Sequence, residues 1–258
     1  MHLPSPRPPQ RSVKVGIPDL LTTANLACGV ASILLASQGQ LTIACGLIFL
    51  AALFDVLDGL AARALGGGSE FGKQLDSLAD MVSFGVAPGI FVNILVYRGV
   101  MTDTMLNGMD VSIADDEHAK WIALAATLII PLASAWRLAK FNLDPRQING
   151  FLGLPTPANA LFWASVLYLS QDASVSLARY SALIVVAASL ILSSLMLSEL
   201  PLPSLKLKST KWKGNEVIYL LLAASLLLII LYGVLAVPLI LIIYLLSPLW
   251  GKLFHRNA

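Results

Sequence analysis

Long apolar runs recur along most of this 258-residue chain and constrain its fold more than any other feature. A helix needs about 20 apolar residues to cross a hydrocarbon core of about 30 Å. We therefore expect an all-α integral membrane protein, a polytopic bundle of about eight transmembrane helices. The runs lie at approximately 19–38, 41–65, 73–98, 120–138, 155–171, 178–198, 216–233 and 235–250.

The composition supports a membrane protein and excludes several other classes. Hydrophobic residues make up 57% of the chain and charged residues 12%, against about 25% charged residues in an average soluble domain. A formal net charge of +2 does not indicate a nucleic-acid partner. Cys28 and Cys45 lie inside apolar runs, so neither a disulfide framework nor a cysteine metal site is expected.

The positions of Lys and Arg predict how the helices are oriented, because these residues accumulate on the cytoplasmic side of a membrane. With a cytoplasmic N-terminus, fourteen of the seventeen Lys and Arg residues fall on cytoplasmic segments, leaving Arg98, Lys120 and Arg179 outside. Both termini are therefore expected on the cytoplasmic side of the cell membrane.

Three segments differ in character along the chain. Residues 1–16 are rich in proline and predict a disordered cytoplasmic tail. Residues 17–208 hold the first six apolar runs and all the motifs described below. Residues 209–258 add two helices and a short cytoplasmic tail. Since these two helices consist almost entirely of Leu, Ile, Val and Ala, they are expected to be a scaffold facing the lipid.

Four aspartates cluster in the second and third apolar runs, although an acidic side chain costs about 2.5 to 3.5 kcal/mol at mid-bilayer. Asp58 follows Asp55 by three positions, which places them about 60° apart on one helix face. Asp80 follows Asp76 by four positions, which places them about 40° apart on the next helix. Three glycines at 66–68 allow the chain to reverse, so that the two pairs face each other near the cytoplasmic leaflet.

Carboxylates at this density require a compensating cation in a medium of low dielectric constant. Ligands that are all oxygen, without Cys or His nearby, favour Mg²⁺ or Mn²⁺, and we expect two ions. Small residues on the same faces would let a ligand approach the backbone. Two other interpretations stay open, namely a structural cluster of charges and the ion path of a cation transporter.

The aspartates are part of a longer pattern, D-x-x-D-G-x-x-A-R-x8-G-x3-D-x3-D, which resembles the signature of the CDP-alcohol phosphotransferases. This family joins a CDP-linked lipid to an alcohol and releases CMP, in a membrane-embedded helical bundle that usually dimerises. The resemblance therefore implies a homodimer whose core is formed by residues 17–208. The matching residues are Asp55, Asp58, Gly59, Ala62, Arg63, Gly72, Asp76 and Asp80.

The resemblance also implies a role for each matched residue. Asp55, Asp58 and Asp76 would hold the metal ions, and Asp80 would contribute to them while acting as the general base. A second group of residues would bind the CDP-lipid. This group comprises Gly59, Ala62, Arg63, Ser69, Gly72, Pro18, Thr22 and Asn25.

Further stretches are similar to the phosphatidylserine synthase branch of the family, and lie at 18–25, 83–89, 137–142, 153–158 and 203–206. They imply CDP-diacylglycerol and L-serine as substrates, with Arg137, Lys140 and Asn142 as candidates for binding the acceptor or a phosphate. Lys140 replaces the usual Arg of that branch, and Asp19 the usual Asn. Inositol phosphate, glycerol phosphate and choline remain alternative acceptors.

Overall fold

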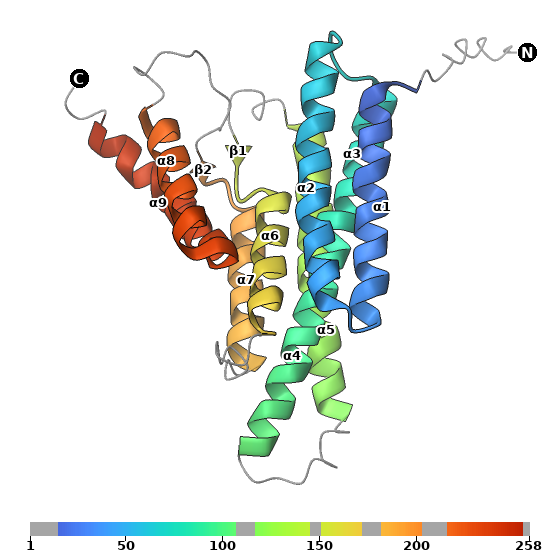
Figure 1. Cartoon of the computed structure of the whole chain (residues 1–258), viewed down its shortest axis with the longest axis vertical. Coiled ribbons are helices and arrows are strands. Elements are labelled where there is room, and N and C mark those ends of the chain that lie inside the picture. The colour runs from blue at the N-terminus through green and yellow to red at the C-terminus, as the bar shows by residue number, and fades with distance from the viewer. Residues whose placement is uncertain (1–14, 107–116, 145–150, 172–181, 203–215, 255–258) are drawn as a thin grey trace, which may run out of the picture.

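A computed structural model describes residues 15–106, 117–144, 151–171, 182–202 and 216–254. Most of these residues are helical, which confirms the all-α prediction (Figure 1). The helices are α1 (Ile17–Ser37), α2 (Leu41–Ala64), α3 (Glu70–Asp80), α4 (Ala87–Leu106), α5 (Glu117–Leu143), α6 (Thr156–Leu169), α7 (Ala182–Leu197), α8 (Glu216–Tyr232) and α9 (Ala236–Phe254).

Five helical segments of the described part are long and apolar enough to cross a membrane. Within the described residues, α6 has 14 residues and α7 has 16, so neither is among these five segments. The pair α8 and α9 belongs to one apolar stretch. The expected count of eight spans therefore stays a prediction. The five segments are Ile17–Ser37, Leu41–Ala64, Glu70–Val100, Lys120–Leu143 and Ile218–Ser247.

One β pairing was not expected from the sequence. Strand β1 (Phe151–Leu152) pairs antiparallel with β2 (Pro201–Leu202), two residues each. Two further bonds follow before α6 begins, because Gly153 N donates to the Leu200 carbonyl at 3.0 Å and Leu154 N to the Leu195 carbonyl at 3.0 Å. Two residues are too few to show an alternating pattern, so the sequence gives no signal for these strands.

A π-helical turn, Met81–Val86, joins α3 to α4 without interrupting the helical path. Single π turns often mark functional sites in helices. Here the turn packs tightly on α1, since a Cβ at Gly29 would lie 2.8 Å from the Cα of Ser83. The Ser83 hydroxyl also donates to the Asn25 carbonyl at 3.0 Å. The turn therefore fixes α1 against the third span.

The last two helices form a pair beside α6 and α7, at the edge of the bundle (Figure 1). A 3-10 turn, Gly233–Leu235, connects them. Leu241 of α9 is buried in the main core, whereas most of the large apolar side chains of α8 are exposed. This pattern agrees with the expected scaffold that faces lipid.

Candidate active site

The turn between α2 and α3 sets the geometry of the aspartate cluster. Gly66 and Gly67 adopt φ values of +92° and +113°, a backbone conformation that favours glycine. Ser69 then caps α3, because its hydroxyl accepts a hydrogen bond from Gly72 N at 2.8 Å. As a result α3 runs back beside α1 and α2 and carries its two aspartates towards those of α2.

Three of the four aspartates come together. Asp55, Asp76 and Asp80 each offer a carboxylate oxygen, and these oxygens lie within 4.8 Å of one another. Asp76 Oδ1 is buried and has no hydrogen-bond partner in the part of the chain that the structure describes. A buried carboxylate oxygen that lacks a donor, beside two further carboxylates, fits a hard divalent cation that takes oxygen ligands. The acidic cluster expected for a metal is therefore present.

Asp58 lies outside this group of three. Its Oδ2 accepts a hydrogen bond from the Thr22 hydroxyl at 2.6 Å, so the fourth carboxylate is bound to α1. The Thr22 hydroxyl also lies 3.0 Å from the Pro18 carbonyl, one turn earlier on α1. Asp58 is buried, as is Thr22.

Asn25 also contacts the aspartates. Its Nδ2 donates to Asp80 Oδ1 at 3.2 Å, and the side chain is fully buried. We expected Asn25 to line the CDP pocket, but the structure places it against Asp80, where it fixes the orientation of that carboxylate. The two residues are 55 positions apart, so nothing in the local sequence indicates the contact.

A cavity of about 450 Å³ opens between the start of α1, the end of α2 and the start of α3. Six of the eight residues expected to bind the CDP-lipid line it, and Arg63 and Asn25 do not. We call this the first cavity. The six are Pro18, Thr22, Gly59, Ala62, Ser69 and Gly72.

Asp19 is a lining residue whose role the sequence left open. Its Oδ2 accepts a hydrogen bond from Gly16 N at 2.7 Å, which caps α1. A Cβ at Gly72 would lie 2.7 Å from Asp19 Oδ1 and 3.2 Å from Ser69 Oγ. The absence of a side chain at Gly72 therefore allows α3 to lie directly against Asp19.

A second cavity, of about 340 Å³, lies on the other side of the aspartates, between α2, α3, α5 and the start of α6. Asp55, Asp80 and Arg63 line it. Asp58, Gly59 and Asp76 line both cavities. The two cavities thus meet at the carboxylates.

Arg137 of α5 also lines the second cavity and is only 7% exposed. Its Nη1 donates to the Thr156 hydroxyl at 2.9 Å, while its Nε is buried without a partner. Among the described residues, the hydrogen-bond partner of the guanidinium is thus a neutral hydroxyl and not a carboxylate. Because a buried N–H of a charged group that lacks an acceptor is costly, the free Nε suits an anionic ligand.

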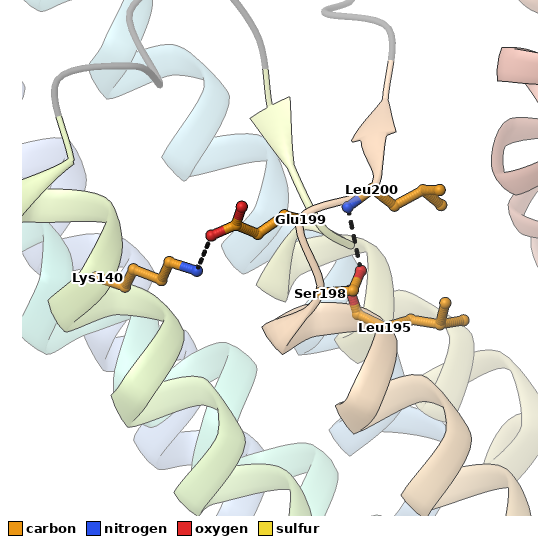
Figure 2. A network of polar contacts seen from close by, with 5 residues as sticks. All are labelled: Lys140, Leu195, Ser198, Glu199 and Leu200. Carbon is orange, nitrogen blue, oxygen red and sulfur yellow. Dashed lines mark hydrogen bonds and ion pairs between the residues drawn. The ribbon is translucent and has the colours of Figure 1, made fainter.

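The other two acceptor candidates face elsewhere. Lys140 Nζ pairs with Glu199 Oε1 at 3.0 Å, between α5 and the segment that follows α7 (Figure 2). Asn142 Nδ2 donates to Ser77 Oγ of α3 at 2.8 Å. Neither Lys140 nor Asn142 is among the residues that line the two cavities. Of the three candidates, only Arg137 lines a cavity together with the aspartates.

Comparisons with known proteins agree with this arrangement. The sequence profile of the CDP-alcohol phosphatidyltransferases matches residues 15–195. The chain is 35% identical to an archaetidylserine synthase of Methanothermobacter thermautotrophicus over 180 residues, which cover 69% of the chain and 67% of that relative. It is 37% identical to a CDP-diacylglycerol–serine O-phosphatidyltransferase of Methanocaldococcus jannaschii over 147 residues, 57% of the chain and 58% of the relative.

The similarity extends to bacterial relatives. A CDP-diacylglycerol–serine O-phosphatidyltransferase of Bacillus subtilis is 30% identical over 142 residues, which cover 55% of the chain and 69% of the relative. The chain covers 49% of a Mycobacterium leprae enzyme with the same name, so the matches span about half to two thirds of the relatives. Both α8 and α9 lie beyond the matched profile. The profile covers both cavities and all four aspartates, and the chain belongs to the CDP-alcohol phosphatidyltransferase family.

Proposed function

We propose that this chain is a phosphatidylserine synthase, which transfers the phosphatidyl group of CDP-diacylglycerol to the hydroxyl of L-serine and releases CMP. The observation that carries the proposal is the pair of cavities that share Asp58, Gly59 and Asp76. Two cavities meeting at one group of carboxylates suit a reaction that joins two substrates. The names of the relatives supply serine as the acceptor and CDP-diacylglycerol as the donor.

The first cavity would bind the CDP group. Gly59, Ala62 and Gly72 have small or no side chains, so a nucleotide can approach the backbone of α2 and α3. The N-terminus of α3 borders the same cavity, and helix N-termini favour phosphates. Lys73, which also lines it, adds a positive charge near the diphosphate.

The carboxylates would hold two divalent cations, Mg²⁺ or Mn²⁺. Asp55, Asp76 and Asp80 form the group with close oxygens, and Asp58 borders it on the side of α1. When bound, such ions neutralise the diphosphate and stabilise the charge on the departing CMP.

The second cavity would bind serine. Arg137 would pair with the carboxylate of serine, since its Nε has no hydrogen-bond partner among the described residues. Asp80 would take the proton of the serine hydroxyl while that oxygen bonds to the phosphorus carrying the lipid. The bond from this phosphorus to the CMP oxygen breaks, and CMP leaves with the electron pair. Asn25 would keep Asp80 in position.

The proposal extends to topology and assembly. We place the protein in the cytoplasmic membrane as a homodimer with eight spanning helices, with residues 17–208 as the enzyme core and residues 209–258 as an addition. The start of α1, the end of α9 and the turn between α2 and α3 lie at the same end of the bundle (Figure 1). This supports a site that opens on the same side of the membrane as both termini.

The decisive test is CMP release from CDP-diacylglycerol by the purified full chain, with and without L-serine, in Mn²⁺ or Mg²⁺ and again in EDTA. We expect release that requires both serine and the metal, with a serine phospholipid as the product. Release only with inositol phosphate, glycerol phosphate or choline would refute serine as the acceptor. No release by folded protein would refute the enzyme and favour measuring ion flux in liposomes.

A further inference from the structure

The last turn of α5 is attached to α3 by two hydrogen bonds, and a third bond within α3 links them. Asn142 Nδ2 donates to Ser77 Oγ at 2.8 Å, and Ser77 Oγ donates to the Lys73 carbonyl at 3.2 Å. Lys73 Nζ donates in turn to the Asn142 carbonyl at 3.3 Å. These bonds close a ring between the two helices, so that each side chain supports the next.

This ring lies next to the carboxylates. Ser77 directly follows Asp76 and precedes Asp80 by three residues, so it lies on the same short helix as both. Neither end of α3 continues as a regular α-helix, because glycines precede it and a π turn follows it. Contacts from neighbouring helices must therefore fix its rotation, and Asn142 supplies one of them.

The other end of the contact lies on the helix that presents Arg137. Asn142 follows Arg137 by five residues on α5, within about 8 Å along the helix axis. A bond from Asn142 to Ser77 thus fixes the separation between Arg137 and the carboxylates of α3. Asn142 lines neither cavity, so its side chain is placed to join the two helices and not to contact a substrate.

We propose that Asn142 is a positioning residue, which holds α3 against α5 through Ser77 and so keeps Asp76 and Asp80 in the geometry that binds the cation. The assignment of these aspartates as metal ligands rests on the proposed function. Losing one hydrogen bond of this kind is expected to weaken cation binding about three- to tenfold.

The test is a double-mutant cycle on the full chain in detergent, with Mn²⁺ binding measured by electron paramagnetic resonance in the absence of substrates. We expect Asn142→Ala and Ser77→Ala to weaken Mn²⁺ binding equally, and the double variant to be no weaker than either. Ser77→Thr keeps the hydroxyl and should restore binding. If Asn142→Ala does not fold, Ser77→Ala and Ser77→Thr test the same bond from α3.

A matched control exists elsewhere in the bundle. Asn93 Nδ2 of α4 donates to the Thr127 hydroxyl of α5 at 2.9 Å, a bond of the same chemistry that borders neither cavity. Asn93→Ala should lower thermal stability while leaving Mn²⁺ affinity unchanged. An equal loss of Mn²⁺ affinity in Asn93→Ala would show that the effect is general destabilisation and would overturn the proposal.

Two further results would also overturn it. Additive losses in the double variant would mean that the two side chains act independently. A raised KM for serine in Asn142→Ala, with Ser77→Ala unchanged, would make Asn142 an acceptor residue. The proposed function has a separate test, which is serine-dependent CMP release by the wild-type chain. The Mn²⁺ measurements contain no substrate, so their result does not depend on whether CMP is released.

Discussion

The third span and the C-terminal pair of helices are both long and apolar, but they are constrained in opposite ways. In the span Glu70–Val100, 67% of the residues in the most apolar window are buried, against 11% in Ile218–Ser247. The third span begins with α3 and its two aspartates, whereas between residues 218 and 247 there is no charged residue. Two segments that are both apolar enough to cross a membrane, with mean hydropathies of 1.7 and 3.1, therefore differ strongly in burial and in charge.

The difference lies in what each region must satisfy. Around α3, buried polar groups depend on specific neighbours, and Asn25 and Thr22 are placed by individual hydrogen bonds to the aspartates. Along α8 most large apolar side chains are exposed, and we expect them to face lipid, which accepts any apolar shape. We therefore expect substitutions near the carboxylates to change the reaction strongly and those on α8 to change it little.

The largest effect is expected at Asp80. Replacing it with Asn removes the proposed base and one carboxylate of the metal cluster while keeping the shape of the side chain. Turnover should fall by at least about 1,000-fold, measured as CMP release. Size-exclusion elution and melting temperature should stay close to wild type. A fully active Asp80→Asn variant would refute the role of Asp80 as the base. It would also remove the expected difference between substitutions near the carboxylates and substitutions on α8.

A smaller effect is expected at Arg137, on the far side of the second cavity. Arg137→Lys keeps the charge but loses the planar guanidinium that pairs with a carboxylate through two hydrogen bonds. The KM for serine should rise about 10- to 100-fold, with the KM for CDP-diacylglycerol unchanged. Thr156→Val removes the 2.9 Å hydrogen bond to Arg137 and should also raise the KM for serine, but by a smaller factor. Equal changes in both KM values would contradict a role specific to serine.

The sequence predicted the site best where residues lie on one helix. The spacings of Asp55 with Asp58 and of Asp76 with Asp80 are local, and so is the reversal at Gly66 and Gly67. Because helical periodicity specifies which residues share a face, it predicted that the two pairs of aspartates face each other, and three of the four form the cluster. The residues of the first cavity followed mainly from the resemblance to the family.

Contacts between distant helices could not be predicted in the same way. Asn142 and Lys140 are two residues apart on α5, yet one turns to α3 and the other to Glu199. Their spacing defines an angle on α5 but not which neighbour lies at that angle. Rotation between helices depends on packing at sites such as Gly29 against Ser83, which a single sequence does not reveal.

A third prediction tests the close approach in the first cavity. Gly72→Ala would place a Cβ 2.7 Å from Asp19 Oδ1, so α3 or Asp19 must shift. The KM for CDP-diacylglycerol should rise about tenfold, because a shift of this size disturbs positioning at the site. Gly46→Ala on α2 is the matched control, since its new Cβ would meet no atom within 4 Å. Equal kinetics for both variants would show that the first cavity tolerates the methyl group.

The smallest effect is expected in the C-terminal helices α8 and α9, where replacing Leu with Ala can be compared at an exposed and at a buried position. Leu226 of α8 is 61% exposed and Leu241 of α9 is 6% exposed. Leu226→Ala should leave kcat and both KM values within about twofold of wild type, because surface substitutions away from specific contacts change little. Leu241→Ala should lower the melting temperature, since a cavity in the core costs stability.

These two variants also decide what the C-terminal pair does. If α8 and α9 are only a scaffold, Leu241→Ala destabilises the protein while the folded fraction keeps its kinetics, and Leu226→Ala changes neither. A drop in turnover for Leu226→Ala, with stability unchanged, would mean that the exposed face of α8 contacts something the reaction needs. In that case a face that is exposed within one chain would still be needed for the reaction. The C-terminal pair would then not differ from the third span in its importance for activity.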